Sequence, residues 1–312
     1  NRCVWSRKTS GLIKRSPPLC LVVFPNQYGY ENEPRTFIQS VGAAAADAWR
    51  GVGRFGFLAL GCGGGIVPAM KTLLFLGLLP IGLFAEKKAA LPKGIPANYE
   101  LVYSQDFEGN EAKEKSRFWF TSPDNWNVPA VRGKSFIEFK TNPSKYKYKV
   151  RSPLTIGLIR DVEVKDFVLE AELQQTGKEY GHRDMCVFYG FKDRSHFYYT
   201  HIASVTDPHA HNCFIVNDKP RIKISHETTK GHKWSAKDWH RVRLVREHAS
   251  GKIEVYVNDM EKPIMRATDK TFDWGRIGFG SFDDAGRVRN VRLYAPEARK
   301  SKVGDPFVEG RK

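Results

Sequence analysis

Between Tyr99 and Tyr294, apolar and polar side chains alternate over short segments, and turn residues interrupt them about every eight to twelve positions. In residues 167–173 (FVLEAEL) every odd-numbered residue is apolar, and the same holds in residues 253–257 (IEVYV). Such alternation places one face of a strand in a core. The segments that we expect to form strands are residues 100–107, 125–128, 135–139, 148–151, 167–174, 185–191, 196–203, 212–216, 221–225, 240–246, 253–257, 276–281 and 288–294.

Short strands at this spacing, without a long helix or an internal repeat, are typical of a β-sandwich or barrel. We therefore predict one all-β domain over residues 99–296, a jelly-roll β-sandwich of two curved antiparallel sheets. About 200 residues in one sandwich give an ample core. Residues 297–312 contain several basic side chains and are expected to form a tail.

The region before the sandwich has the pattern of a targeting signal. Residues 70–85 (MKTLLFLGLLPIGLFA) place one lysine before an apolar run and a small residue before Glu86, which is typical of a secretory signal peptide. The alternatives are a transmembrane anchor, for which the run is shorter than the roughly 20 residues required, and a lipoprotein signal at Cys62. We expect a secreted or periplasmic protein without a stable membrane span, a non-native or disordered extension over residues 1–69, and a linker over residues 86–98.

The chain is basic, with a formal net charge of +16, and residues 86–312 hold 41 Lys and Arg against 31 Asp and Glu. This excess suggests an anionic partner. The basic residues are spread along the strands and no recognition motif for nucleic acid occurs, so we expect no nucleic-acid partner. Residues 86–312 contain two cysteines, Cys186 and Cys213, which could form a disulfide in an exported protein or remain buried free thiols.

Residues 183–217 combine aromatic and titratable side chains more densely than any other segment. Strand alternation puts Tyr199 and His201 on one face, and His196 and Tyr198 on the other. One of these faces belongs to the core, so we expect the other to line a concave groove.

The loop after this strand offers a further cluster. If the loop is extended, His209 and His211 project together, as in many metal sites, and Asp207 could join them. Contacts to sugar hydroxyls and an inert loop are the alternatives.

Four motifs in the sandwich region resemble those of a known superfamily. They are SQDFEGN (104–110), DFVLEAEL (166–173), WHRVRLVREHASGKIEVYVND (239–259) and GRIGFGSFDDAGRVRNVRLY (275–294). They are similar to the concanavalin A-like lectin/glucanase superfamily, in particular to laminin-G-like jelly rolls and to domains described as keto-disaccharide hydrolases or family-sixteen-like glycoside hydrolases. The resemblance covers roughly residues 99–296 and implies a protein that acts on carbohydrate.

The catalytic motif of the superfamily's glucanases is missing. Those enzymes carry two glutamates and an aspartate as E-x-D-x-x-E on one strand, and no such motif occurs here. Glu170 and Glu172 share a strand face, which we interpret as a solvated surface. β-Elimination of a uronate is a second chemistry, in which Arg183, Tyr199, His201 and Asn212 could neutralise the carboxylate, remove a proton and protonate the leaving oxygen. An acidic glycan would suit the basic domain.

The resemblance also implies a structural calcium between the first and last strands, held by Asp106, Gly109 and Asn290. Among the tryptophans at 126, 234, 239 and 274, Trp239 is expected in the core and Trp234 is the better platform for a sugar ring. Asp283 and Asp284 are interpreted as turn residues.

We therefore expect a carbohydrate-active protein that binds, and as a glycoside hydrolase or lyase cleaves, a polysaccharide or oligosaccharide. A non-catalytic carbohydrate-binding or adhesion module is the alternative, and a structural envelope domain is a third. The expected catalytic residues are Tyr199, His201, His209, His211 and Arg183, and the expected substrate-binding residues are Asn212, Asp184, Tyr198 and Trp234.

Overall fold

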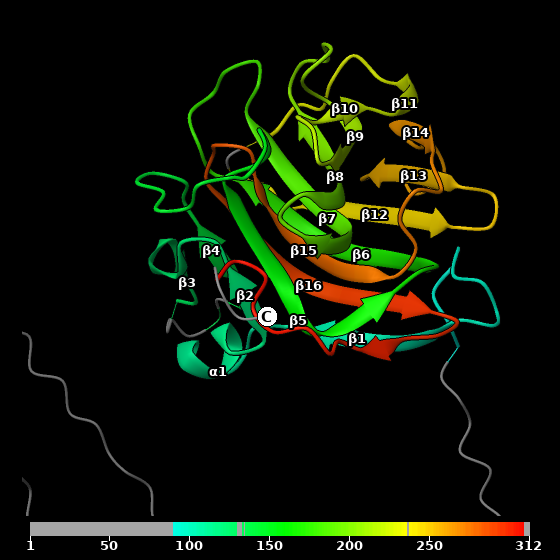
Figure 1. Ribbon diagram of the computed structural model, residues 1–312, viewed down its shortest axis with the longest axis horizontal. Coiled ribbons are helices and arrows are strands. Elements are labelled where there is room, and N and C mark those ends of the chain that lie inside the picture. Colours follow the sequence, from blue (N-terminus) through cyan, green and yellow to red (C-terminus); the bar gives the residue numbers. More distant parts are fainter. Residues whose placement is uncertain (1–89, 130–132, 134, 236, 309–312) are drawn as a thin grey trace, which may run out of the picture. The chain divides into compact units, whose positions relative to one another are not determined.

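The computed structural model describes residues 90–129, 133, 135–235 and 237–308. The expected extension, signal peptide and start of the linker lie outside the described residues, as do residues 309–312 of the expected tail. The described chain forms two antiparallel sheets that pack as a sandwich, as Figure 1 shows, so the predicted fold class is confirmed. No helix in the described part is long and apolar enough to cross a membrane.

Sheet A contains nine strands and sheet B eight. In spatial order, sheet A consists of β11 (Ser225–Thr228), β14 (Met265–Thr268), β13 (Lys252–Val257), β12 (His240–Glu247), β6 (Phe167–Gln175), β16 (Gly286–Ala295), β4 (Ile137–Phe139) and β3 (Trp126–Asn127), with β1 (Glu100–Gln105) also paired to β16. Sheet B consists of β10 (Ile222–Lys223), β9 (Asn212–Asn217), β8 (His196–Ala203), β7 (Asp184–Asp193), β15 (Gly275–Ser281), β5 (Thr155–Val164) and β17 (Arg299–Lys300), with β2 (Phe118–Phe120) paired to β5. One short α-helix, α1 (Glu111–Lys115), and one 3₁₀ turn, η1 (Pro123–Asn125), precede β3.

The inner faces of the two sheets enclose the main core. Sheet A contributes the alternating residues of β6, including Phe167, Leu169 and Leu173, and sheet B contributes Met185 and Ile277. Each large apolar side chain that is removed from water here stabilises the fold by about 2 kcal/mol. The alternation seen in the sequence therefore identifies the inner face of sheet A.

Sheet B differs because its outer face is buried as well. Nine residues form an outer cluster there: Ile156, Leu158, Cys186, Phe188, Phe191, Phe197, Tyr199, Phe214 and Val216. Val150 and Phe307 pack against this cluster from segments outside the central strands, and Trp119 packs against it from β2 of the same sheet. Strand β5, which the sequence pattern did not predict, has apolar residues on both faces for this reason. Residues 148–151, predicted as a strand, are outside every ladder and belong to the covering segment.

The expected tail is part of the sandwich as far as the structure describes it. β17 pairs with β5, and Arg299 lies 3.5 Å from the centroid of the Trp274 ring. Arg276 is 1% exposed and donates hydrogen bonds to Ser301 Oγ at 2.6 Å and to the Val303 carbonyl. Phe307 then packs edge-on against Phe191. The segment 297–308 thus closes the outer face of sheet B.

The two cysteines are free thiols. Cys186 belongs to the outer cluster and Cys213 to the inter-sheet core. Because the two side chains lie on opposite faces of sheet B, they do not approach each other, and of the two alternatives left open by the sequence the structure has the free thiols.

Replacing Arg276 with Leu should release the C-terminal segment while the sandwich stays folded. Two hydrogen bonds from a buried guanidinium are lost, which costs about 2–3 kcal/mol. Hydrogen exchange of residues 299–307 should become faster and the melting temperature should fall by several degrees. Lys300→Ala, an exposed residue of β17 within the C-terminal segment, is the control. Unchanged exchange of residues 299–307 in the Arg276 variant would contradict this role.

Candidate functional site

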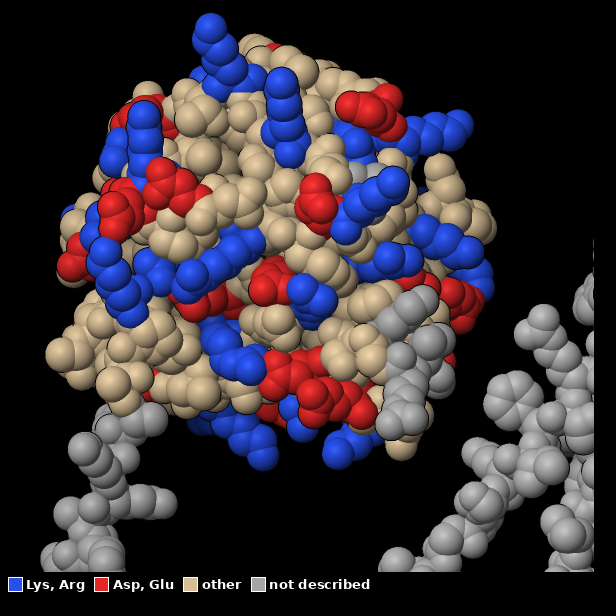
Figure 2. All heavy atoms as spheres, turned by 180° about the vertical axis from the view of Figure 1, so that it is seen from behind, with Lys and Arg blue, Asp and Glu red and all other residues tan. Residues whose placement is uncertain are grey.

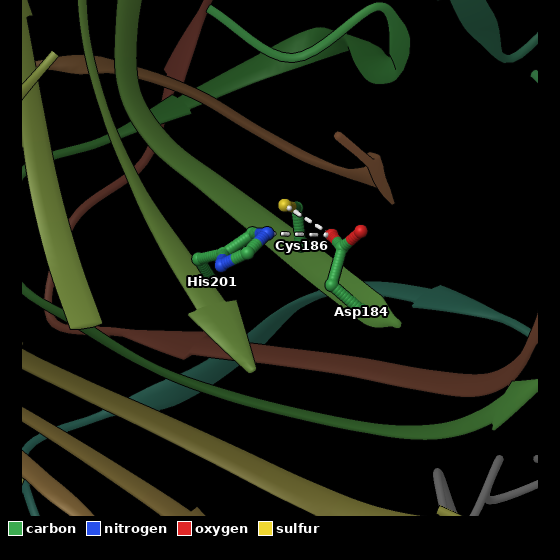
Figure 3. Close-up of side chains that lie close together, drawn as sticks. All are labelled: Asp184, Cys186 and His201. Atoms are coloured by element: carbon green, nitrogen blue, oxygen red, sulfur yellow. Dashed lines mark hydrogen bonds and ion pairs between the residues drawn. The ribbon is translucent and has the colours of Figure 1, made fainter. Parts of the chain in front are cut away.

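Asp184, the first residue of β7, is a fully buried carboxylate that collects hydrogen bonds from three parts of sheet B. Cys186 Sγ donates to its Oδ2 at 3.1 Å, and His201 Nε2 on β8 lies 3.4 Å from the same oxygen. Figure 3 shows both side chains pointing at the Asp184 carboxylate. Ser281 Oγ donates to Oδ1 at 2.8 Å and the Phe282 amide to Oδ2 at 2.9 Å. We call Asp184, Cys186 and His201 the Asp184 cluster.

The protonation of the Asp184 cluster follows from its contacts. Burial would raise the pKa of Asp184, but His201, Cys186 and the Phe282 amide outweigh burial and lower it. Burial and the Asp184 charge hold the pKa of Cys186 well above its usual value, so the residue stays a thiol. A nucleophilic cysteine needs the opposite shift. The cluster therefore does not form a thiolate nucleophile.

The Asp184 cluster brings an acid, a thiol and an imidazole together at spacings that also suit a tetrahedral metal site. The backbone N–H of His211 donates to His201 Nδ1 at 3.3 Å, however. Nδ1 must accept that bond, so Nε2 carries the proton and donates to Asp184. A metal would need Nε2 free of its proton. The donors around this carboxylate thus fit a hydrogen-bonded anchor and do not fit a metal ion.

The Asp184 cluster fixes an adjoining surface site. The Asp184 amide donates to Asp284 Oδ2 at 2.9 Å, and the Asp284 amide donates to Ser281 Oγ at 2.8 Å. Tyr180 donates to the same Asp284 oxygen at 2.9 Å and also lies 3.4 Å from Asp283 Oδ1. The two carboxyl groups that follow β15 are thereby held side by side under one tyrosine hydroxyl.

These three side chains open into a surface hollow of about 470 Å³, which we call the Tyr180 hollow. It lies where β4, β6 and β15 end, and its lining residues are Lys140, Thr141, Asn142, Lys178, Glu179, Tyr180, Asp283, Asp284 and Ala285. Burial, followed by the Asp184 charge, raises the pKa of Asp284 to about 6 and also raises that of Asp283. Convergent polar groups with shifted pKa values in a hollow make it a candidate functional site.

Gly177 keeps the Asp284 carboxyl group in place. A Cβ atom on this residue would lie 2.8 Å from Asp284 Oδ1 and 3.0 Å from Gln175 Nε2. Both distances are too short for a carbon atom, so any larger residue would displace the Asp284 side chain.

The residues that the sequence predicted as catalytic are not assembled in an open groove. Tyr199 is 0% exposed within the outer cluster, and His201 belongs to the Asp184 cluster. Arg183 is buried and donates from Nε to Gln175 Oε1 at 2.8 Å. His209 is exposed, whereas His211 is buried and lies 2.9 Å from Thr229 Oγ1. The expected pairing of His209 with His211 is therefore not formed.

The residues predicted to bind substrate also have structural contacts. Asn212 Nδ2 donates to the carbonyls of Asp207 and Ala210, which holds the intervening turn. Tyr198 lies in the inter-sheet core and donates to Asp269. Trp234 is buried and donates to the Ile202 carbonyl at 3.0 Å, so it presents no indole face to a sugar. Asp184 alone of this group adjoins the Tyr180 hollow, through its amide.

The expected calcium site does not fit its residues. Asp106 places Oδ1 at 2.7 Å and Oδ2 at 3.0 Å from the guanidinium of Arg292, so both oxygens face a cation of the protein. The Gly109 amide donates to Glu114, and Asn290 is exposed with a φ of 52°. A divalent ion would have to displace Arg292 from the carboxylate.

Tyr180, Asp283 and Asp284 were not among the predicted site residues. The interpretation of Asp283 and Asp284 as turn residues holds, since they connect β15 to β16. The sequence signal that could have indicated this site was the adjacent pair of aspartates. Two neighbouring carboxylates repel each other when both are ionised, which raises the pKa of one of them. Tyr180 approaches them from a loop about a hundred positions away, which no local pattern reveals.

Comparison with protein-family models gave no match, and comparison with curated proteins gave none either. Similar solved structures include a Bacillus subtilis protein of unknown function with a galectin-like fold (10% identity, TM-score 0.43, covering 65% of this chain and 100% of that one). Domain 4 of an extracellular arabinanase from Geobacillus stearothermophilus, in complex with arabinotriose, has 9% identity, a TM-score of 0.41 and coverage of 63% and 93%. A beta-1,3-glucanase from Mycobacterium marinum has 10% identity, a TM-score of 0.39 and coverage of 62% and 98%. Proteins of the kind named by the sequence resemblance are thus among the similar structures.

Replacing Asp284 with Asn should stabilise the protein at pH 8. The folded-state pKa of about 6 lies above the ordinary value of 3.8, so the ionised form is disfavoured in the fold, by about 3 kcal/mol at most. This cost is present above pH 6 and is relieved as the pH falls toward 4. Thermal unfolding of the variant should therefore show a gain at pH 8 that shrinks by pH 5. The exposed Asp238→Asn should show neither effect, and a loss of stability at pH 8 in the Asp284 variant would contradict the prediction.

Acid should destabilise the fold through His211. Burial lowers the pKa of this residue to about 4, below its ordinary value of 6.5. Its contribution is complete above pH 6.5 and is lost as the pH falls from 6.5 through 4, by about 3 kcal/mol at most. His211→Gln should reduce this slope in urea unfolding measured between pH 7 and 4.5. The exposed His209→Gln should leave the slope unchanged, and equal slopes in both variants would refute the assignment.

Proposed function

We propose that this domain binds a carbohydrate chain in a groove formed by the Tyr180 hollow and the hollow beside it. The second hollow measures about 540 Å³, includes Lys115, Asn125, Asn127 and Glu138, and shares Lys140 and Ala285 with the first. Each volume is in the range of small-molecule sites. Two adjoining hollows give room for more than one sugar unit.

The observation that carries the proposal is the set of groups in the Tyr180 hollow. A pyranose offers an apolar face of C–H groups and a rim of hydroxyls. Tyr180 is 43% exposed and supplies an aromatic ring, while Asp283 and Asp284 accept hydrogen bonds and Asn142 both donates and accepts. The Asp184 cluster holds the aspartates in position before a ligand arrives, which reduces the entropy cost of binding.

Hydrolysis of a glycosidic bond is a second candidate function, because the two carboxyl groups lie so close together. Oxygen atoms of Asp184, Asp283 and Asp284 all lie within 4.8 Å of one another. Retaining glycosidases hold their two carboxyl groups about 5 Å apart. Asp284 keeps its proton up to about pH 6 and could donate it to the glycosidic oxygen, while Asp283 assists at the anomeric carbon.

The earlier expectation of chemistry by Tyr199, His201 and Arg183 is not part of this proposal, because all three are buried. Export of the protein is part of it, and this rests on the sequence of residues 70–85 alone. A secreted or periplasmic location would bring the groove into contact with extracellular glycans.

Glycan binding should depend on the Tyr180 hollow. On an array of neutral and acidic oligosaccharides, the full chain should bind at least one glycan, and Tyr180→Ala and Asp283→Asn should each weaken that binding about tenfold. Tyr256→Ala, a half-buried tyrosine of sheet A, should bind as the wild type does. If the wild type releases reducing ends, and if Asp284→Asn abolishes this release but still binds the glycan, the protein is a hydrolase. Absence of binding to every glycan would refute both functions.

A further inference from the structure

The charges on the outer face of sheet A are paired. Arg241 and Arg243 contact Glu170, and Arg289 contacts Glu172. Further along the same face Arg287 pairs with Glu138, Arg292 with Asp106, and Arg266 with Glu254 and Glu227. Figure 2, which views the domain from behind, shows basic and acidic side chains interspersed. This face carries many arginines but little net charge.

Segment 145–151 (KYKYKVR) is different. Lys147, Lys149 and Arg151 are exposed, and none of the three has an ion pair with another described residue. Lys145 is paired with Asp124 at 2.6 Å. This segment therefore concentrates three unneutralised cations within five residues, whereas the sequence had suggested that the basic residues are spread along the strands.

The segment is built into the fold and presents its cations outward. Ser122 Oγ accepts hydrogen bonds from the amides of Lys145 at 2.9 Å and Tyr146 at 3.2 Å. Tyr146 packs edge-on against Phe307, and Val150 packs against the outer cluster. Tyr146 and Val150 thus anchor the segment, and the exposed odd-numbered residues follow at a spacing of about 7 Å if the backbone is fully extended.

Arg221 adds a fourth cation at the end of the segment. Its amide donates to the Arg151 carbonyl at 3.4 Å. The guanidinium carbons of Arg221 and Arg151 lie 4.3 Å and 5.7 Å from the centroid of the same Phe282 ring. Neither guanidinium is in an ion pair within the part of the chain that the structure describes. Arg221 Nη2 donates to the His209 carbonyl at 3.3 Å, and the buried Nε and Nη1 of Arg221 have no hydrogen-bond acceptor there. Two like charges over one ring repel each other, and an anion beside them would relieve that repulsion.

The cations and the Tyr180 hollow are formed by residues that are neighbours in the sequence, at two places in the chain. Phe282, whose ring both guanidinium groups face, directly precedes Asp283 in the chain. At the other end, Lys140 and Asn142 line the hollow just before segment 145–151 begins. A linear ligand that leaves the hollow can therefore continue over these cations.

We propose that Lys147, Lys149, Arg151 and Arg221 form a basic track for the acidic groups of a linear polysaccharide, whose neighbouring sugar unit occupies the Tyr180 hollow. The inference rests on the proposed carbohydrate function and names its substrate class, a glycan with carboxylate or sulfate groups. Lysine and arginine on an extended segment suit repeated oxyanions.

An acidic polysaccharide fits better than nucleic acid. The ligand must present hydroxyls to Asp283 and Asp284 in the hollow and anions to the track. An acidic polysaccharide offers both on each sugar unit, whereas the nucleotides of DNA are joined through phosphates and have no free sugar hydroxyls within the chain. Binding of bases in a single strand also uses successive aromatic platforms, and segment 145–151 exposes one ring, that of Tyr148.

The test measures binding of the full chain to polygalacturonate, dextran sulfate, duplex DNA and a panel of neutral glycans at about 50 and 300 mM salt. Wild-type binding to at least one acidic polymer should be tighter than to any neutral glycan and should weaken with salt. The triple variant Lys147→Gln, Lys149→Gln, Arg151→Gln should lose about tenfold in affinity for that polymer at low salt and most of the salt dependence.

The matched control is Lys237→Gln, Lys262→Gln, Lys270→Gln, which removes the same charge from exposed lysines without an ion pair elsewhere on the domain. It should change affinity less than twofold, and both variants should melt as the wild type does. A preference for polygalacturonate or for dextran sulfate would identify the oxyanion as carboxylate or sulfate, and either supports the track.

The outcomes separate this inference from the proposed function. Neutral glycans bound as tightly as acidic ones, or equal losses in the two triple variants, would overturn the track and leave carbohydrate binding intact. Tighter binding to duplex DNA than to either acidic polymer, lost in the track variant, would assign the track to nucleic acid and overturn the inference. Failure to bind any glycan would refute the proposed function itself.

Discussion

The buried carboxylate of Asp184 links the fold of this protein to its candidate site. Its oxygens accept hydrogen bonds from β7, β8 and the turn that follows β15, so three neighbouring elements of sheet B share one anion. A buried carboxylate without hydrogen-bond donors would cost several kcal/mol. The donors from the turn are therefore held in place, and the turn is rigid. Asp283 and Asp284 follow directly in this turn. Their position depends on Asp184, and their pKa values are raised first by burial and then by the Asp184 charge.

The covered outer face of sheet B explains where the site lies. Segment 145–151 and the C-terminal segment pack over the aromatic outer cluster, so no open concave surface remains over Tyr199 and Phe197 among the described residues. Polar groups that must reach a ligand are left to the loops at the strand ends, where the Tyr180 hollow is found. The same covering segment carries exposed cations on its other side. Segment 145–151 thus buries apolar side chains against sheet B on one side and exposes cations to solvent on the other.

The sequence predicted the sandwich because strand alternation is a local property, and β6, β8, β12 and β13 lie within a residue or two of the expected ranges. It did not reveal β5, whose residues are apolar on both faces because sheet B is buried on both. The burial of three residues predicted for the site has a related reason. Tyr199, His201 and Arg183 stand out as reactive types, but their exposure depends on segments far away in the chain. Tyr180 meets Asp284 across about a hundred positions, and only the folded chain reveals that contact.

The titrating groups near the site act in opposite directions over one pH interval. Between pH 6.5 and 4, His211 must remain neutral inside the fold, and His232, with its pKa also lowered to about 4, adds to this cost of acid. Asp284 is protonated over the same interval, which removes an unfavourable charge and offsets part of that cost. The hollow can therefore lose a negative charge near pH 6, and the stability gained by protonating Asp284 offsets part of what the two histidines lose. Loss of that charge also reduces the repulsion between Asp283, Asp284 and an approaching acidic sugar, so mild acid should favour an anionic ligand at the hollow while the permanently charged track is unaffected.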